Sequence, residues 1–297
     1  MSILPGPKLN KKTIVFLLVF TGFLIFWILI NVFHTFSNLN SARSVFTNTY
    51  GVIAFIGGIF AIYISKLWGG YKSLIGRAIF IFGLSLLAQE FGQLMYAYYI
   101  YVRHIPVPYP SLGDIGYFGS DLLILFAIYT LFRASGSKFS LTTLTNKLQT
   151  IIIPIIILSI SYTIFLRGYV FSGAHPLTVF LDFGYPFVEA IYVSIAVLVL
   201  TLSRKYLGGL MKMPIVFVLL SLMTLYIADF IFLYQVKNNT WVPGGSNDLE
   251  YCIAYFLLSL SLLSFERAYS KIKSADSQTK PTNIPTTNQS GSIEEAN

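Results

Sequence analysis

The residues of this sequence that could do chemistry are carboxylic acids placed in or beside long apolar stretches, where a charge is costly. Glu90 begins the pattern EFxxL, and Asp229 begins the matching pattern DFxxL further along the chain. Asp114 begins DIxY, and Asp248 begins DLxY at a closely similar offset. Carboxylates that recur in this way mark a candidate site for a cation, an amine or a proton.

Three more acids extend this set. Asp121 follows Asp114 by seven residues, and Glu189 follows Asp182 by the same spacing, which places each pair on one face of a helix. We expect the whole set to line one polar pocket. The candidate ligand-binding residues are Glu90, Asp114, Asp121, Asp182, Glu189, Asp229 and Asp248.

A structural role is the alternative for each of these acids. Asp114, Asp182 and Asp248 lie where helices are expected to begin, so they could cap helix N-termini and interact with the helix dipole. Glu90 and Asp229 fall inside the expected helices, so capping does not explain them. Their alternatives are a ligand or coupling role and a structural pairing between two related halves of the chain.

The sequence shows no motif for catalysis or for metal binding. The sequence contains no P-loop, HExxH or GxSxG motif. Cys252 is the single cysteine, and His34, His104 and His175 follow no metal-ligand spacing. We therefore expect no catalytic residue, no metal site and no cofactor, and hence no enzyme.

Long apolar helices must position the acids. The sequence is 55% hydrophobic and 11% charged, against roughly 25% charged residues in a soluble domain. Its apolar stretches approach the ~20 residues that a helix needs to cross a membrane. The predicted fold is an all-α integral membrane protein of eight transmembrane helices. These spans are residues 13–33, 50–66, 77–101, 115–133, 149–166, 180–203, 213–236 and 249–265.

The recurring motifs predict an internal repeat within this membrane domain. Residues 13–134 and 149–268 would form two halves of four spans each. Because four is an even number, the second half enters the membrane in the same direction as the first, which makes the repeat parallel. Residues 1–12 would form a cytoplasmic N-terminus, and the polar residues 269–297 a disordered cytoplasmic tail.

The distribution of positive charge predicts the orientation. If the N-terminus is inside, all but four of the 20 Lys and Arg lie on the inner side. The positive-inside rule therefore places both termini in the cytoplasm and the protein in the plasma membrane. The net charge of +8 then reports topology and does not indicate a nucleic-acid-binding surface. In this orientation the acidic pocket would face outward.

Three motifs resemble those of a known module. Residues 108–118, PYPSLGDIGYF, resemble the PSxADxxYL signature of a multi-span membrane module of bacteria and archaea. Residues 182–186, DFGYP, resemble its DxxYP element, and Ala228-Asp229 with Gly244-Gly245-x-x-Asp248 resembles its closing element. That module commonly precedes GGDEF diguanylate-cyclase, EAL, PAS or histidine-kinase domains. The resemblance covers most of residues 50–268 and implies an integral-membrane sensory input module.

The chain departs from that pattern at Gly113, where the module usually has Ala, and at Ser120-Asp121, where a Tyr-Pro pair often lies. No output domain follows in this sequence, so we expect signalling through a cytoplasmic partner protein. The first expected function is a receptor-like sensor of a small cationic ligand. The alternatives are a small cation- or proton-coupled permease and a structural subunit of a membrane complex.

Overall fold

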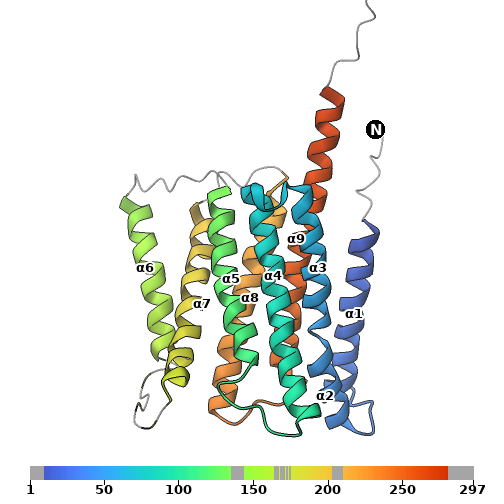
Figure 1. Ribbon diagram of the computed structural model, residues 1–297, viewed down its shortest axis with the longest axis vertical. Coiled ribbons are helices and arrows are strands. Elements are labelled where there is room, and N and C mark those ends of the chain that lie inside the picture. The colour runs from blue at the N-terminus through green and yellow to red at the C-terminus, as the bar shows by residue number, and fades with distance from the viewer. Residues whose placement is uncertain are drawn as a thin grey trace, which may run out of the picture.

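The computed structural model describes residues 10–134, 144–163, 167, 171, 173, 175–202 and 210–279, and every regular element among them is a helix (Figure 1). The elements are α1 (Lys11–Asn31), α2 (Leu39–Thr49), α3 (Val52–Leu67), η1 (Gly70–Lys72), α4 (Leu74–Ala97), η2 (Tyr98–Val102), α5 (Gly113–Ala134), α6 (Leu144–Ser161), α7 (Pro176–Leu202), α8 (Lys212–Lys237) and α9 (Ser246–Thr279).

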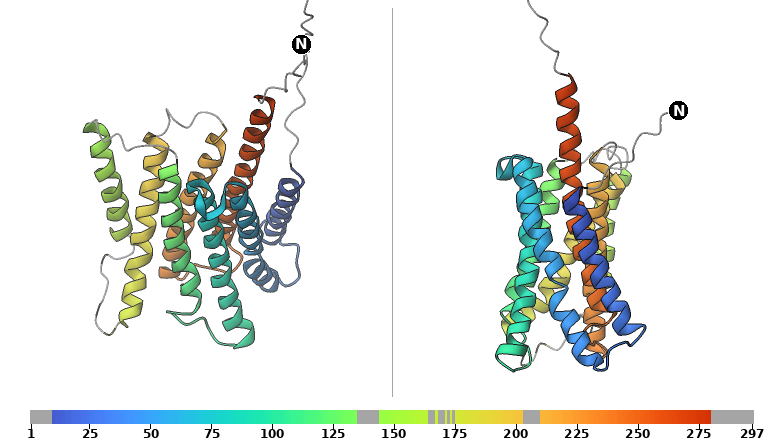
Figure 2. Two further views of the ribbon diagram at one scale, coloured as in Figure 1. Left: turned by 45° about the horizontal axis from the view of Figure 1, so that its top comes forward. Right: turned by 90° about the vertical axis from the view of Figure 1, so that its right-hand side faces the viewer.

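The centre of the bundle is formed by α3, α4, α5, α7, α8 and α9, and α1 and α6 lie at its opposite edges (Figures 1 and 2). Helix α4 packs between α3 and α5, and α8 packs against α9. Two further contacts close the bundle, because α3 also packs against α9 and α5 against α7. The hydrophobic core is built mainly from aliphatic and aromatic side chains of these helices, and polar side chains are buried beside it.

Seven helical segments in the described residues are long and apolar enough to cross a membrane. They involve α1, α2 with α3, α4, α5, α7, α8 and α9. Large apolar side chains also cover the outside of the bundle; Leu18 and Phe126, for example, are 66% and 61% exposed. Hydrocarbon would solvate such a surface, so the chain is a multi-pass helical membrane protein.

The remaining predicted span, residues 149–166, corresponds to α6, whose apolar part is the shorter segment Ile151–Ile160. This is about half the length that a perpendicular crossing of the hydrocarbon core requires. Residues 164–166 of the predicted span lie outside the described residues. The eight-span count therefore stays a prediction.

Helix α2 has no counterpart among the predicted spans. Its sequence is too polar to read as a membrane segment, but it is amphipathic, with Ala42 and Phe46 buried. Asn38 caps its N-terminus, because the Asn38 Oδ1 accepts from the Ser41 backbone N–H at 3.0 Å. The chain then passes through Gly51 directly into α3, so that α2 extends the second span at one end.

Helix α9 continues well past the predicted end of the membrane domain at residue 268. It runs from Ser246 to Thr279, a length of about 50 Å against a hydrocarbon core of about 30 Å. Its last turns project beyond the bundle on the side where α1 begins (Figure 1). Residues 280–297, the rest of the predicted tail, lie outside the described residues.

Glycines let α4 and α5 approach each other closely beside the acidic residues. A Cβ placed on Gly116 would lie 2.5 Å from the backbone oxygen of Ala88 and 2.5 Å from the backbone nitrogen of Gly92. A side chain at position 116 would therefore meet backbone atoms of α4, which cannot swing aside. Such small residues are the usual means by which membrane helices come into direct contact.

Candidate functional site

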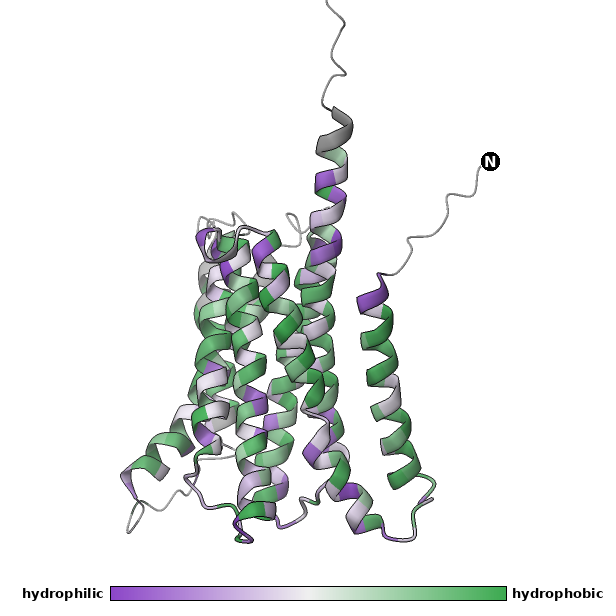
Figure 3. Ribbon diagram, turned by 45° about the vertical axis from the view of Figure 1, so that its right-hand side comes forward, coloured by the Kyte–Doolittle hydropathy of each residue, from purple (hydrophilic) through white to green (hydrophobic). Residues whose placement is uncertain are grey.

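Polar side chains gather inside the half of the bundle that contains α2. Figure 3 shows hydrophilic segments in this lower half of the central helices, between long apolar stretches. The seven predicted site residues are carried by α4, α5, α7, α8 and α9. The bundle therefore brings acids from distant parts of the sequence into one region. Six of them lie in three separate environments, and Asp182 lies apart from these.

The first environment is a cluster of three carboxylates, Asp121 of α5, Glu189 of α7 and Asp229 of α8. Asp121 and Glu189 are only 3% and 4% exposed. The charge of Asp229 acts on both of the other acids, and that of Asp121 acts on Glu189. Within the described part of the chain, no Lys, Arg or His forms an ion pair with any of them. We call these three residues the carboxylate cluster.

Tyrosine hydroxyl groups lie near the carboxylate cluster, and one of them lacks a partner. The Tyr251 hydroxyl donates to Asp229 Oδ1 at 2.7 Å. By contrast, Tyr192 is fully buried, and its hydroxyl has no hydrogen-bond partner. The charges of all three clustered acids act on Tyr192. Buried polar groups normally find partners, so this arrangement fits a bound cation or water that completes their bonding.

Asp114 and Asp248 form the second environment, at the N-termini of α5 and α9. Asp114 Oδ2 accepts from the Ser111 backbone N–H at 2.7 Å, and Asp248 Oδ2 accepts from that of Gly244 at 2.7 Å. Both carboxylates therefore lie in the first turn of their helices, where the capping alternative placed them, and each bonds a backbone N–H just before the helix. Each carboxylate also reaches another helix, because Asp114 accepts from the Tyr185 hydroxyl at 2.9 Å and Asp248 from that of Thr47 at 2.6 Å.

The capping prediction is wrong for Asp182. Helix α7 begins at Pro176, more than a turn earlier, and its first turn contains no acidic residue. Asp182 Oδ1 instead accepts from the hydroxyl of Tyr109 in the loop before α5, at 2.7 Å. Burial and then this hydrogen bond raise the pKa of the Tyr109 hydroxyl. Asp182 therefore fastens that loop to α7.

Glu90 forms the third environment, where α4 meets the start of α3. Its Oε2 is buried without a hydrogen-bond partner, and a Cβ on Gly51 would lie 2.0 Å from this atom. The charge of Glu90 acts on Tyr117 and Tyr255. The charges of Asp121 and Asp229 also act on Tyr255, so this tyrosine is near both Glu90 and the carboxylate cluster.

Sequence reasoning missed two amides of α4 that take part in this polar interior. Gln89 accepts from the Tyr255 hydroxyl at 3.0 Å, and Gln93 donates to the Thr47 backbone oxygen. Both side chains are 7% exposed. Their spacing of four residues within an apolar span was the available signal, because it places both amides on one helix face beside Glu90.

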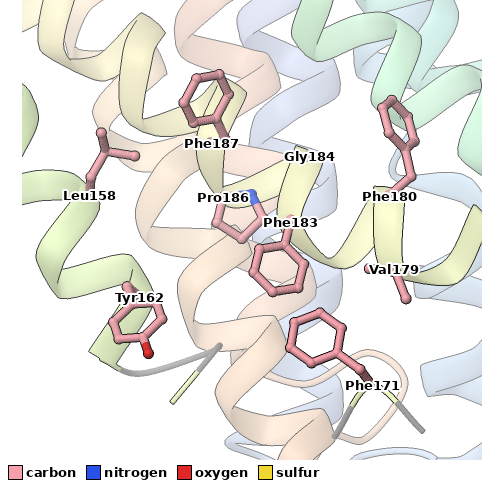
Figure 4. Close-up of a pocket in the computed structure, with 9 residues that line it drawn as sticks. All are labelled: Leu158, Tyr162, Phe171, Val179, Phe180, Phe183, Gly184, Pro186 and Phe187. Atoms are coloured by element: carbon pink, nitrogen blue, oxygen red, sulfur yellow. The ribbon is translucent and has the colours of Figure 1, made fainter. Parts of the chain in front are cut away.

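A pocket among the described residues lies elsewhere, in a crevice between α6 and α7 (Figure 4). It has a volume of about 670 Å³ and apolar walls. The lining residues are Leu158, Tyr162, Phe171, Val179, Phe180, Phe183, Gly184, Pro186 and Phe187. None of the seven predicted acids lines it. That these acids share one outward-opening cavity stays a prediction.

Fold and site together define a helical, multi-pass membrane protein with a carboxylate-rich polar interior. Among protein-family models, curated proteins and solved structures, none matches this chain.

Proposed function

We propose that this protein is a sensory, receptor-like membrane module that binds a proton or a small cation at the carboxylate cluster. The observation that carries the proposal is the burial of Asp121 and Glu189 next to Asp229, with no basic partner in the described residues. The buried hydroxyl of Tyr192, which these acids act on, also lacks a partner. An uncompensated group of buried acids is unfavourable. A positively charged ligand would relieve it.

The helix packing supports a parallel 4+4 repeat as the framework of this site. If α3, α4 and α5 correspond to α7, α8 and α9, the contact of α3 with α9 corresponds to that of α7 with α5. The cap contacts follow the same rule, since Asp114 reaches Tyr185 of α7 and Asp248 reaches Thr47 just before α3. The carboxylate cluster would then lie where the two halves meet.

Helix α9 provides a route from the site to a cytoplasmic partner protein. It carries Asp248, Tyr251 and Tyr255 in the polar interior and continues without a break to Thr279. A ligand that pulls the halves together would bias the position of this one helix. The resemblance of the motifs to sensory input modules agrees with this arrangement.

A small cation- or proton-coupled permease is the second candidate. The observation that favours it is the placement of Glu90 and Asp229 within α4 and α8, helices that correspond in the proposed repeat. Coupling acids of transporters lie at such positions near the middle of the membrane. The two candidates differ in whether the bound cation crosses the membrane.

Thermal unfolding of the purified full chain in detergent, with a panel of cations, tests the proposal. We expect Na⁺, K⁺, methylammonium or choline, or acidification, to raise the unfolding midpoint, because a ligand bound to the folded state stabilises it. At a concentration of about 100 times Kd the stabilisation would approach 2.7 kcal/mol. The effective cation is the one that raises the unfolding midpoint of the wild type but not that of Glu189→Gln.

Two outcomes discriminate the alternatives. If the effective cation enters proteoliposomes through the protein, the permease is the correct function. If no cation and no change of pH stabilises the wild type more than Glu189→Gln, the carboxylate cluster is not a cation site and the proposal fails.

We also propose that both termini are cytoplasmic. The described start of α1 and end of α9 lie on the same side of the bundle (Figure 1), as the distribution of Lys and Arg predicts. In a Cys252→Ser background, Thr240→Cys should react with an impermeant thiol reagent in intact cells, and Ser274→Cys should react only after lysis. Both positions are exposed in the structure. If only Ser274→Cys were labelled in intact cells, the orientation would be the opposite of the proposed one.

A further inference from the structure

Arg267 of α9 has an incompletely bonded guanidinium group at the end of the bundle opposite the carboxylate cluster. Its Nε and Nη2 atoms are buried, and neither has a hydrogen-bond partner. The residue as a whole remains partly exposed. A guanidinium is always charged and has five N–H donors. Burying its donors without an acceptor is costly.

The neighbouring carboxylate does not serve Arg267, because it is already engaged. Glu266 Oε1 accepts from Lys12 Nζ at 2.8 Å, and Glu266 Oε2 accepts from Asn10 Nδ2 at 3.3 Å. Lys12 also lies over the ring of Tyr63 at 4.0 Å. These contacts fasten α1 to α9 through Glu266 and leave Arg267 without an acidic partner in the described part of the chain.

The depth of Arg267 corresponds to a membrane surface. It lies 19 residues along α9 from Asp248, which is about 28 Å and close to the thickness of the hydrocarbon core. Trp68 and Tyr269 stack edge-on at this level, and Trp68 Nε1 donates to the Phe265 backbone oxygen at 3.2 Å. Tryptophan and tyrosine gather where the headgroups of a bilayer begin.

This end of the bundle is also basic. Helix termini at this end carry Lys11, Lys12, Lys66, Lys72, Arg77, Arg133, Lys212, Lys271 and Lys273. A ligand that approaches here meets a positive potential. Basic positions between membrane helices at such a surface favour the phosphate of a lipid headgroup.

We propose that Arg267 is the centre of an anion site that binds a phosphate group, supplied by an anionic phospholipid of the adjacent leaflet. The planar fork of a guanidinium donates two parallel hydrogen bonds to phosphate oxygens, which are the acceptors that Nε and Nη2 lack. The site lies on the helix that also carries Asp248, but it does not depend on cation binding at the carboxylate cluster.

The test compares lipid binding by the purified full chain and by Arg267→Gln. Native mass spectrometry in detergent would count phosphatidylglycerol molecules retained per protein, with phosphatidylcholine as the neutral lipid. We expect the wild type to prefer phosphatidylglycerol and Arg267→Gln to need about tenfold more of it for half-saturation, as expected for loss of a charged hydrogen bond. Arg133→Gln is the matched control, because it removes the same charge from this basic end at an exposed position, the end of α5. It should weaken binding much less than Arg267→Gln.

Each result decides the proposal. Equal retention of phosphatidylglycerol by the wild type and Arg267→Gln would overturn it, as would an equal loss in Arg133→Gln. If inorganic phosphate displaces the lipid from the wild type, the site takes free phosphate as well; if it does not, the lipid headgroup is the ligand. If Arg267→Gln fails to fold, the wild type alone tests the proposal. Equal retention of phosphatidylglycerol and phosphatidylcholine by the wild type would refute the site.

Discussion

Glu189→Gln is expected to make the cation-free protein more stable than the wild type. The change keeps the size of a side chain that is 4% exposed and removes its repulsion by Asp229 and Asp121. Substitutions that relieve a strained functional site commonly stabilise a protein by about 1 kcal/mol. This corresponds to a rise of roughly 2–4 °C in the unfolding midpoint for a chain of this size class, measured at neutral pH in a buffer of a bulky cation.

The control for this prediction is Asp114→Asn, which should have the opposite sign. Asp114 Oδ2 accepts from the Ser111 N–H and its Oδ1 accepts from the Tyr185 hydroxyl. An amide has one oxygen and cannot satisfy both donors, so we expect a loss of about 1–2 kcal/mol.

If Glu189→Gln also destabilises the protein, the carboxylate cluster is a structural pairing and not a ligand site. This outcome would favour the third alternative, a structural subunit of a membrane complex. The sign of the change in stability thus separates the functional reading from the structural one without knowledge of the ligand.

Gly116→Ala should destabilise the fold, and more so than the same change at Gly119. The added methyl group would lie 2.5 Å from two backbone atoms of α4, so α4 and α5 must separate along the interface next to Asp114 and Asp121. Overpacking of this kind costs about 1–3 kcal/mol and sometimes more. We expect a clearly lower unfolding midpoint and a smaller monodisperse peak on size exclusion in detergent.

Gly119→Ala is the matched control, because it makes the same change one turn along the same helix. A Cβ at Gly119 meets no atom within 4 Å, and alanine favours a helix by up to about 1 kcal/mol relative to glycine. The unfolding midpoint should stay the same or rise. Equal effects at positions 116 and 119 would contradict the close packing of α4 on α5.

The apolar stretches predicted most of the helices, because a span of about 20 apolar residues has few other uses. What they could not predict were the helical segments outside hydrocarbon. Helix α2 depends on Ala42 and Phe46 packing into a bundle that is invisible from its own sequence. The extension of α9 to Thr279 is polar on most sides, so its sequence predicts a disordered tail instead of a helix.

The candidate site was predictable residue by residue but not as a grouping. The cost of an acid in an apolar span singled out all seven carboxylates. Which of them meet depends on α5, α7 and α8 being neighbours, as their packing requires. The residues around them, Tyr192, Gln89 and Gln93, gave weaker signals, because one tyrosine or amide in a span is inexpensive compared with a charge.

The clasp formed by Lys12 and Glu266 divides α9 into two arms of unequal length. From Glu266 to Asp248 is about 27 Å, and from Glu266 to Thr279 is about 20 Å. If α9 rocks as a rigid rod about this fulcrum, the projecting tip moves in the opposite direction by roughly three-quarters of the displacement at Asp248. Most of a shift of a few ångströms at Asp248 would then reach the projecting tip on the other side of the membrane. A pivot nearer the tip would make the movement of the tip smaller.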